Sequence, residues 1–134
     1  MSDVAVMSPE WAQAYRHLWN GSAEIRQGAK DLTMLIEWRV QDADDQVAQL
    51  EIADGEAIYG GSQIEGGRKP DFVLTATSNV WHRVAEGEIG VASAIATRKI
   101  KFVGPIKVAM ANMAVLSAGL RLVGQVDGLV WGGD

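Results

Sequence analysis

Residues 71–116, DFVLTATSNVWHRVAEGEIGVASAIATRKIKFVGPIKVAMANMAVL, decide the fold through the changes of periodicity along this stretch. Phe72, Leu74 and Ala76 recur at every second position, which is the spacing of a strand with one buried face. Ser78 then offers a helix cap, and Pro105 stands where proline is favoured, at the start of a helix. The stretch therefore predicts, in order, a strand over 71–77, a helix over 78–84, a short helix over 91–96, a strand over 99–103 and a helix over 105–120.

Two helices and three strands are predicted upstream of this stretch. Ser8, Pro9 and Glu10 combine a capping hydroxyl, a proline at the first helical position and an acid near the positive end of the helix dipole. They predict a helix that ends at residues 20–21, and Ser22 begins a shorter one to about residue 27. The period then changes to two, which predicts strands over 32–41 and 48–52 and a third ending at Tyr59. Short turns at 42–45 and 54–55 make these strands an antiparallel meander, and the glycine-rich residues 60–69 predict a loop.

The segment from Pro105 to Leu120 carries more apolar surface than one sheet can cover. Of its 16 residues, 11 are aliphatic or methionine, and only Lys107 is charged. A helix that covers one sheet face would have a polar stripe on its far side, and here the polar residues are scattered around the axis. The second apolar face therefore meets a bound ligand, another subunit or the rest of an ordinary core, and the sequence leaves these three interpretations open.

Length and charge limit the function further. The 134 residues predict one domain over 1–134, and the net charge of −5 argues against a nucleic-acid partner, because phosphates require a basic surface. Residues 89–126 nevertheless contain five bases and no acid. The chain has no cysteine, and its N-terminus resembles no secretory signal, so we expect a soluble, cytoplasmic protein.

Few residues are candidates for catalysis or metal binding. His17 and His82 are the only histidines, and His82 lies four positions before Glu86, a spacing that places two ligands side by side on a helix. No third ligand follows at a matching spacing, so a solvated helix face is the better interpretation. Ser62 lacks the glycines of a nucleophile elbow, and the glycine pairs match no phosphate-binding loop. The sequence predicts no catalytic residue, no metal and no cofactor.

The order of elements resembles the sterol carrier protein type two family. The residues that carry the resemblance are FVLTAT at 72–77, Trp81, EGEI at 86–89, AIA at 94–96 and KIKFVG at 99–104. The likeness extends more loosely from Ser8 to about Leu122. Two positions depart from the family pattern. Thr97-Arg98 stands where a glycine usually precedes the basic strand, and Pro105 stands where an aspartate usually follows the final glycine.

The resemblance implies an α/β (α+β) fold: a five-stranded, mainly antiparallel sheet with helices on one side and an apolar tunnel between the layers. Members of the family bind sterols, fatty acyl chains, phospholipids or quinone intermediates, and some serve as dimerisation or substrate-presenting modules. Strand faces and helix periodicity nominate ten residues as the lining of this tunnel: Met34, Ile36, Phe72, Leu74, Ile95, Ile100, Phe102, Met110, Met113 and Leu116.

Three functions are therefore weighed. The leading one is a module that binds and carries or presents an apolar, lipid-like ligand. The second is an enzyme acting on an apolar substrate with His82 or a carboxylate at the tunnel mouth as base, and the third is a homodimerisation domain.

The segment without acids contains five bases: Arg98, Lys99, Lys101, Lys107 and Arg121. They either keep a strand edge soluble, or they orient the domain toward an anionic membrane surface or toward the phosphate of a ligand such as acyl-CoA. Ile100 and Phe102 point one way on their strand, so Lys99 and Lys101 should point to solvent.

Overall fold

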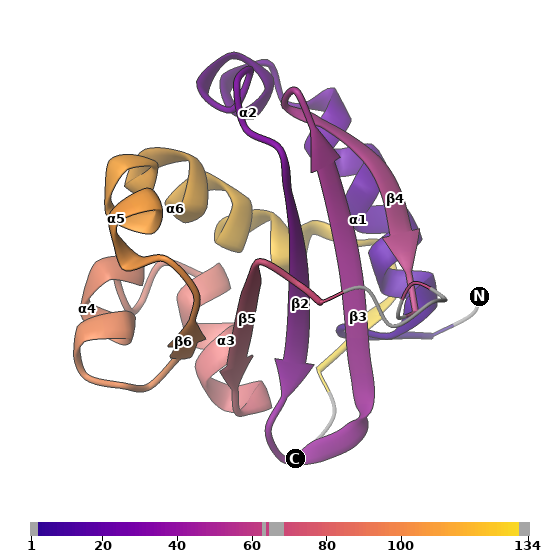
Figure 1. Ribbon diagram of the computed structural model, residues 1–134. Coiled ribbons are helices and arrows are strands. Elements are labelled where there is room, and N and C mark those ends of the chain that lie inside the picture. Colours follow the sequence, from indigo (N-terminus) through magenta and orange to yellow (C-terminus); the bar gives the residue numbers. More distant parts are fainter. Residues whose placement is uncertain (1–2, 63, 65–68, 132–134) are drawn as a thin grey trace.

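The sheet has five strands in the order β4-β3-β2-β5-β6, and helices cover one of its faces (Figure 1). The computed structural model describes residues 3–62, 64 and 69–131. Its strands are β1 (Val4–Ala5), β2 (Met34–Val40), β3 (Ala43–Ala53), β4 (Glu56–Gly61), β5 (Phe72–Ala76), β6 (Lys101–Val103) and β7 (Leu129–Val130). Its helices are α1 (Pro9–Gly21), α2 (Ala23–Gly28), α3 (Ser78–Ala85), α4 (Val91–Ala96), α5 (Ile106–Ala111), α6 (Met113–Leu122) and the 3-10 helix η1 (Val123–Gln125).

The predicted mainly antiparallel sheet is confirmed. Strand β3 pairs antiparallel with β2 and β4, and β5 pairs antiparallel with β6, so within the described five-stranded sheet only the central β2–β5 pair is parallel. Short turns connect β2 to β3 and β3 to β4, and each of these pairs is antiparallel. The parallel partner of β2 is β5, which follows much later in the chain, because parallel strands cannot be joined by a tight turn. No helix within the described ranges combines the length and hydropathy of a bilayer-crossing segment.

Helix α1 packs closely on β4 because Gly60 has no side chain. A Cβ atom at Gly60 would collide with the carbonyl oxygen of Ala12 in α1. The helix begins as predicted, with Ser8 accepting a hydrogen bond from the backbone N–H of Trp11, and ends where α2 begins at Ser22. Arg16 and Asn20 add hydrogen bonds to the carbonyl of Ala57 in β4.

An aromatic cluster fills the space between α1 and the sheet. Trp38 of β2 packs against Trp11, Tyr15 and Trp81, with ring centroids 5.7, 5.5 and 6.0 Å away. The Tyr15 hydroxyl donates to the carbonyl of Gly119 in α6 at 2.6 Å, and Trp11 Nε1 donates to Val123 at 3.2 Å. Complete burial raises the pKa of the Tyr15 hydroxyl above its ordinary value. Through these bonds α1 fixes the position of α6.

On the opposite face of the sheet, Ile64 and Asp71 make hydrogen bonds to strands β3 and β2. Asp71 exchanges hydrogen bonds with the backbone of Leu35, which is fully buried on that face. Glu37, also buried, accepts hydrogen bonds from Arg39 and Gln49, and Gln49 in turn accepts from the backbone N–H of Ile64. Both faces of the central strands are therefore packed.

Four details differ from the sequence expectation. Strand β3 begins at Ala43, inside the predicted turn, because Val40 and Ala43 already pair. Strand β6 begins only at Lys101, because Arg98 has a left-handed backbone with φ 62° and the N–H of Ile100 bonds back to Ala94. Thr77 rather than Ser78 caps α3. The short parallel pair of β1 and β7 was not predicted.

The predicted helix over 105–120 is interrupted at Asn112. The side-chain amide of Asn112 donates to the carbonyl of Val108 at 2.8 Å, and its backbone leaves the helical region with φ −120° and ψ 28°. Asparagine favours such local bonds over a continuous helix. Pro105 is the N-cap of α5, and α6 begins directly after the break.

The contact between Gly60 and Ala12 predicts that Gly60→Ala lowers the free energy of unfolding by about 1–3 kcal/mol, because the new methyl group must displace a helix backbone. Urea unfolding measures this change. Gly21→Ala is the matched control, since a Cβ atom at Gly21 has no neighbour within 4 Å. Equal stabilities of the two variants would contradict the close α1–β4 packing.

Candidate functional site

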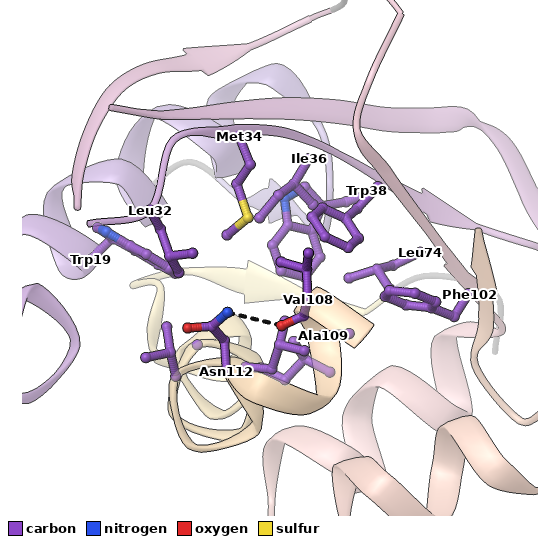
Figure 2. A pocket seen from close by; sticks show the side chains of 15 residues that line it. Trp19, Leu32, Met34, Ile36, Trp38, Leu74, Phe102, Val108, Ala109 and Asn112 are labelled. Atoms are coloured by element: carbon purple, nitrogen blue, oxygen red, sulfur yellow. Dashed lines mark hydrogen bonds between the residues drawn. The ribbon is translucent and has the colours of Figure 1, made fainter. Parts of the chain in front are cut away.

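An apolar pocket lies between the sheet and the helices α5 and α6 (Figure 2). Met34 lies on its sheet side, and Val108 and Asn112 lie on its helix side. The complete lining consists of Trp19, Leu32, Met34, Ile36, Trp38, Phe72, Leu74, Phe102, Val108, Ala109, Asn112, Val115, Leu116, Gly119 and Leu120.

The sheet side of the pocket follows from strand register. Residues 34, 36 and 38 of β2 point to the helix-covered face, because side chains alternate along a strand. In the parallel β2–β5 pair, Ile36 lies opposite Phe72 and Trp38 opposite Leu74. Phe102 of β6 lies opposite Leu74 in turn and packs on Phe72 with ring centroids 5.4 Å apart. Three strands thereby present one continuous apolar surface.

The helix side is a stripe at helical spacing. Val108 and Asn112 are four positions apart at the end of α5, and Val115 and Gly119 are four apart on one side of α6; all four border the pocket. Gly119 also permits a close approach, since a Cβ atom there would meet the Tyr15 hydroxyl and the Trp19 ring at 3.2 Å. The stripe thus comes near the sheet without filling the whole space between them.

The free volume of this pocket is about 20 Å³. A single buried water molecule needs about 10–15 Å³ on the same measure, so the pocket is closed to a lipid in this conformation. Helix α5 is the least embedded wall, because Ala109 is its only buried residue. An outward movement of α5 is therefore the simplest way to enlarge the pocket.

Six of the ten nominated residues border the pocket: Met34, Ile36, Phe72, Leu74, Phe102 and Leu116. The structure places the other four outside it. Ile95 and Ile100 belong to a shallow surface depression on the far side of Phe102. Met110 is 61% exposed, and Met113 is half-buried against the core without reaching the pocket.

Sequence reasoning missed several lining residues for an identifiable reason. The stripe that faces the pocket contains Asn112 and Gly119, which a search for apolar residues passes over. Val108 and Val115 are seven positions apart and belonged to the second apolar face of the predicted helix. That second face was therefore the pattern that could have identified them as lining residues. Trp19 comes from α1, and nothing in the local pattern relates it to a helix a hundred residues later.

Among the described residues that line the pocket, polar side-chain atoms come from the Asn112 amide and the indoles of Trp19 and Trp38. Asn112 uses its amide on Val108, as described above. The indole Nε1 of Trp38 is buried and has no acceptor within the described part of the chain. In contrast, Trp11, Trp19 and Trp81 each donate to a backbone carbonyl, Trp19 to Gly55 at 3.0 Å. An unpaired buried N–H costs about 1–3 kcal/mol.

The titratable candidates lie elsewhere. His82 Nε2 is 3.1 Å from Glu86 Oε2, both side chains are about half exposed, and the His82 ring stacks on Trp131 at 4.4 Å. They border a surface groove and not the apolar pocket. His17 is exposed on α1. In the part of the chain that the structure describes, no three acidic, histidine or cysteine residues come together to hold a metal.

Comparisons with known proteins agree on one family. The family model described as the SCP-2 sterol transfer family matches residues 15–117. No curated protein matches the sequence.

Solved structures show the fold in separate proteins and inside an enzyme. The crystal structure of a sterol carrier protein 2 superposes with a TM-score of 0.78 at 21% identity, over 90% of this chain and 98% of that one. A possible sterol carrier protein from Thermus thermophilus gives 0.70 at 22% identity, over 92% of each chain. A sec-alkylsulfatase from Pseudomonas sp. gives 0.51 at 19% identity, over 81% of this chain but only 15% of the sulfatase. Because its model covers most of the sequence, the chain belongs to the SCP-2 sterol transfer family.

Proposed function

We propose that this protein binds an apolar, lipid-like molecule in the pocket and carries or presents it. The observation that carries the proposal is the lining itself: among the described residues that form it none is charged, and apart from the indoles of Trp19 and Trp38 only Asn112 has a polar side chain. Such a surface binds hydrocarbon through the hydrophobic effect and offers no charge to a polar substrate. Family membership supports the same class of ligand: a sterol, a fatty acyl chain, a phospholipid or an isoprenoid of the quinone type.

Ligand binding requires that the pocket grows. The six nominated residues that already border the closed pocket are the proposed contacts, together with Trp38, Val108 and Val115. Met110 lies on α5 and Met113 follows directly at the start of α6, so an outward movement of α5 would bring them into the lining only in the opened form. Ile95 and Ile100 remain with the surface depression beyond Phe102.

The unpaired N–H of Trp38 refines the chemistry of the ligand. A ligand that places a carbonyl or hydroxyl oxygen beside Trp38 supplies the acceptor that the protein lacks there. A hydrogen bond of this kind contributes about 0.5–1.5 kcal/mol. A charged group in the same position finds no counter-charge among the lining residues. We therefore propose an uncharged ligand whose buried end carries an acceptor oxygen.

The two alternatives have less support. An enzyme with His82 as base requires the imidazole to reach the substrate, and His82 lies at a different surface groove. A homodimerisation or presenting module remains compatible with the exposed side of α5. We propose that the chain functions as a single domain. We also propose that it works in the reducing cytoplasm, because it has no cysteine. Exchange of the ligand also implies transient contact with an anionic membrane surface.

The first functional prediction is ligand-dependent stability. An uncharged lipid at a hundred times its dissociation constant should raise the free energy of unfolding by about 2.7 kcal/mol, because it binds only the folded protein. Thermal melting in the presence of sterols, acyl esters and quinones measures the shift, and mass spectrometry of an organic extract identifies any copurified ligand. A set of such ligands that leaves the melting temperature unchanged contradicts the proposal.

Filling the pocket should abolish this effect. Ala109→Leu adds three carbon atoms at a buried pocket position, so the ligand-induced melting shift should disappear, at a cost of about 1–3 kcal/mol in stability. Ala111→Leu on the same helix is the matched control, since Ala111 is exposed and borders no pocket. A full melting shift in Ala109→Leu would place the ligand elsewhere.

The donor at Trp38 predicts a specific selectivity. Trp38→Phe should reduce the affinity for a long-chain methyl ketone about fivefold relative to the alkene of equal length, because only the ketone accepts a hydrogen bond. Displacement of a fluorescent lipid probe measures both affinities. Trp19→Phe is the control: Trp19 also lines the pocket, but its N–H is already bonded to Gly55, so the ratio of affinities should not change. An unchanged ratio in Trp38→Phe refutes the donor role.

A further inference from the structure

Exposed apolar side chains gather at the end of β6 and on α5. Val103 is 64% exposed, Ile106 51% and Met110 61%. Ile106 and Met110 are one helical turn apart and share a face of α5. The other large exposed apolar residues on the described surface, apart from Val108 at the pocket, are Ile58 and Val130, which lie on different strands.

Basic side chains surround these apolar residues. Ile106 shares a shallow surface depression with Arg98 and Lys101, so the strand and the helix form one continuous surface. Lys107 lies next to Ile106 in the sequence, and all three bases are exposed. We call the set of Arg98, Lys101, Val103, Ile106, Lys107 and Met110 the α5 patch.

No acid interrupts the α5 patch in the sequence, because residues 89–126 contain none. Across the sheet, the backbone of Asp71 lies beside Gly104. Its carboxylate already accepts a hydrogen bond from the backbone N–H of Leu35 at 2.8 Å. The patch therefore combines apolar side chains with positive charge that this carboxylate does not reach.

This combination decides between two occupants. A symmetric dimer through the patch would bring two copies of Arg98, Lys101 and Lys107 together with no acid from the patch to pair them, which is unfavourable. An anionic bilayer satisfies both features, because its headgroups attract the bases and its acyl region accepts the apolar side chains.

We propose that the α5 patch is the surface by which this protein docks on an anionic lipid bilayer. Ile106, Met110 and Val103 enter the interface, and the three bases contact lipid phosphates or carboxylates. This inference rests on the proposed lipid-binding function, and it names the partner and the surface that meets it.

The position of α5 joins docking to ligand exchange. The outer side of the helix carries Ile106 and Met110, while Val108 and Ala109 border the pocket. Docking through the outer side places the pocket wall at the membrane interface. A ligand then passes between bilayer and pocket when α5 moves, without crossing bulk water.

Flotation with phospholipid vesicles tests the proposal without added ligand. The protein should float with vesicles of phosphatidylcholine and phosphatidylserine in equal parts at low salt, and stay behind with phosphatidylcholine alone. Lys101→Gln with Lys107→Gln should weaken the partition about fivefold per base. Ile106→Ser with Met110→Ser should weaken it at both low and high salt, because the apolar contribution is not screened.

Matched controls separate this surface from general effects. Ile58→Ser removes an equally exposed apolar side chain on β4, and Lys30→Gln removes an exposed base elsewhere. Both control variants should float like the parent. Ala109→Leu, with its pocket filled, should also float, because docking does not require a bound lipid. Circular dichroism and melting verify that each variant is folded.

Several outcomes overturn the inference. These are failure of the parent to bind anionic vesicles, equal losses in the control variants, or a stable dimer that the patch variants dissociate. Loss of flotation in Ala109→Leu would likewise overturn it, since vesicle binding would then be lipid uptake by the pocket. If vesicles bind through the patch while no ligand shifts the melting temperature in solution, docking stands and the proposed lipid-binding function fails.

Discussion

The packing of Trp38 against Trp11, Tyr15 and Trp81 sets the separation between the sheet and its helices. Large, rigid rings limit how closely two layers can approach each other. This aromatic cluster lies next to α1, on the helix-covered face of the sheet. The hydroxyl of Tyr15 then ties α6 to this level through Gly119. The pocket lies beside this cluster, and Trp38 is also one of its lining residues.

The strand half of this site could be predicted from the sequence, and the helix half only in part. A period of two assigns each strand residue to one face, so Met34, Ile36, Phe72 and Leu74 followed directly from the pattern. On the helices the stripe that faces the sheet contains Asn112 and Gly119, and hydropathy gives such residues no weight. The prediction chose methionines on these helices instead, although Met110 is one of the most exposed apolar residues. The volume of the pocket depends on how side chains pack, which no periodicity encodes.

The fold followed from the sequence where elements are long and regular. The five-stranded sheet and helix α1 carry strong patterns and clear caps, and both were predicted. The pair β1–β7 has two residues in each strand, too few for any period to appear, and it joins segments that are far apart in the chain. The break at Asn112 depends on one side-chain hydrogen bond that competes with the helix, and an otherwise apolar sequence conceals it.

The hydrogen bonds on the opposite face of the sheet have a consequence for ligand shape. Asp71 is bonded to Leu35, and Glu37 is bonded to Arg39 and Gln49, so hydrogen bonds hold the central strands together on the side away from the pocket. Ala109 is the only buried residue of α5, so the space grows most easily outward past this helix. A bulky molecule therefore meets resistance at the hydrogen-bonded strands, whereas a long one extends toward the surface. A pocket that opens in this direction would limit the width of a bound molecule more than its length.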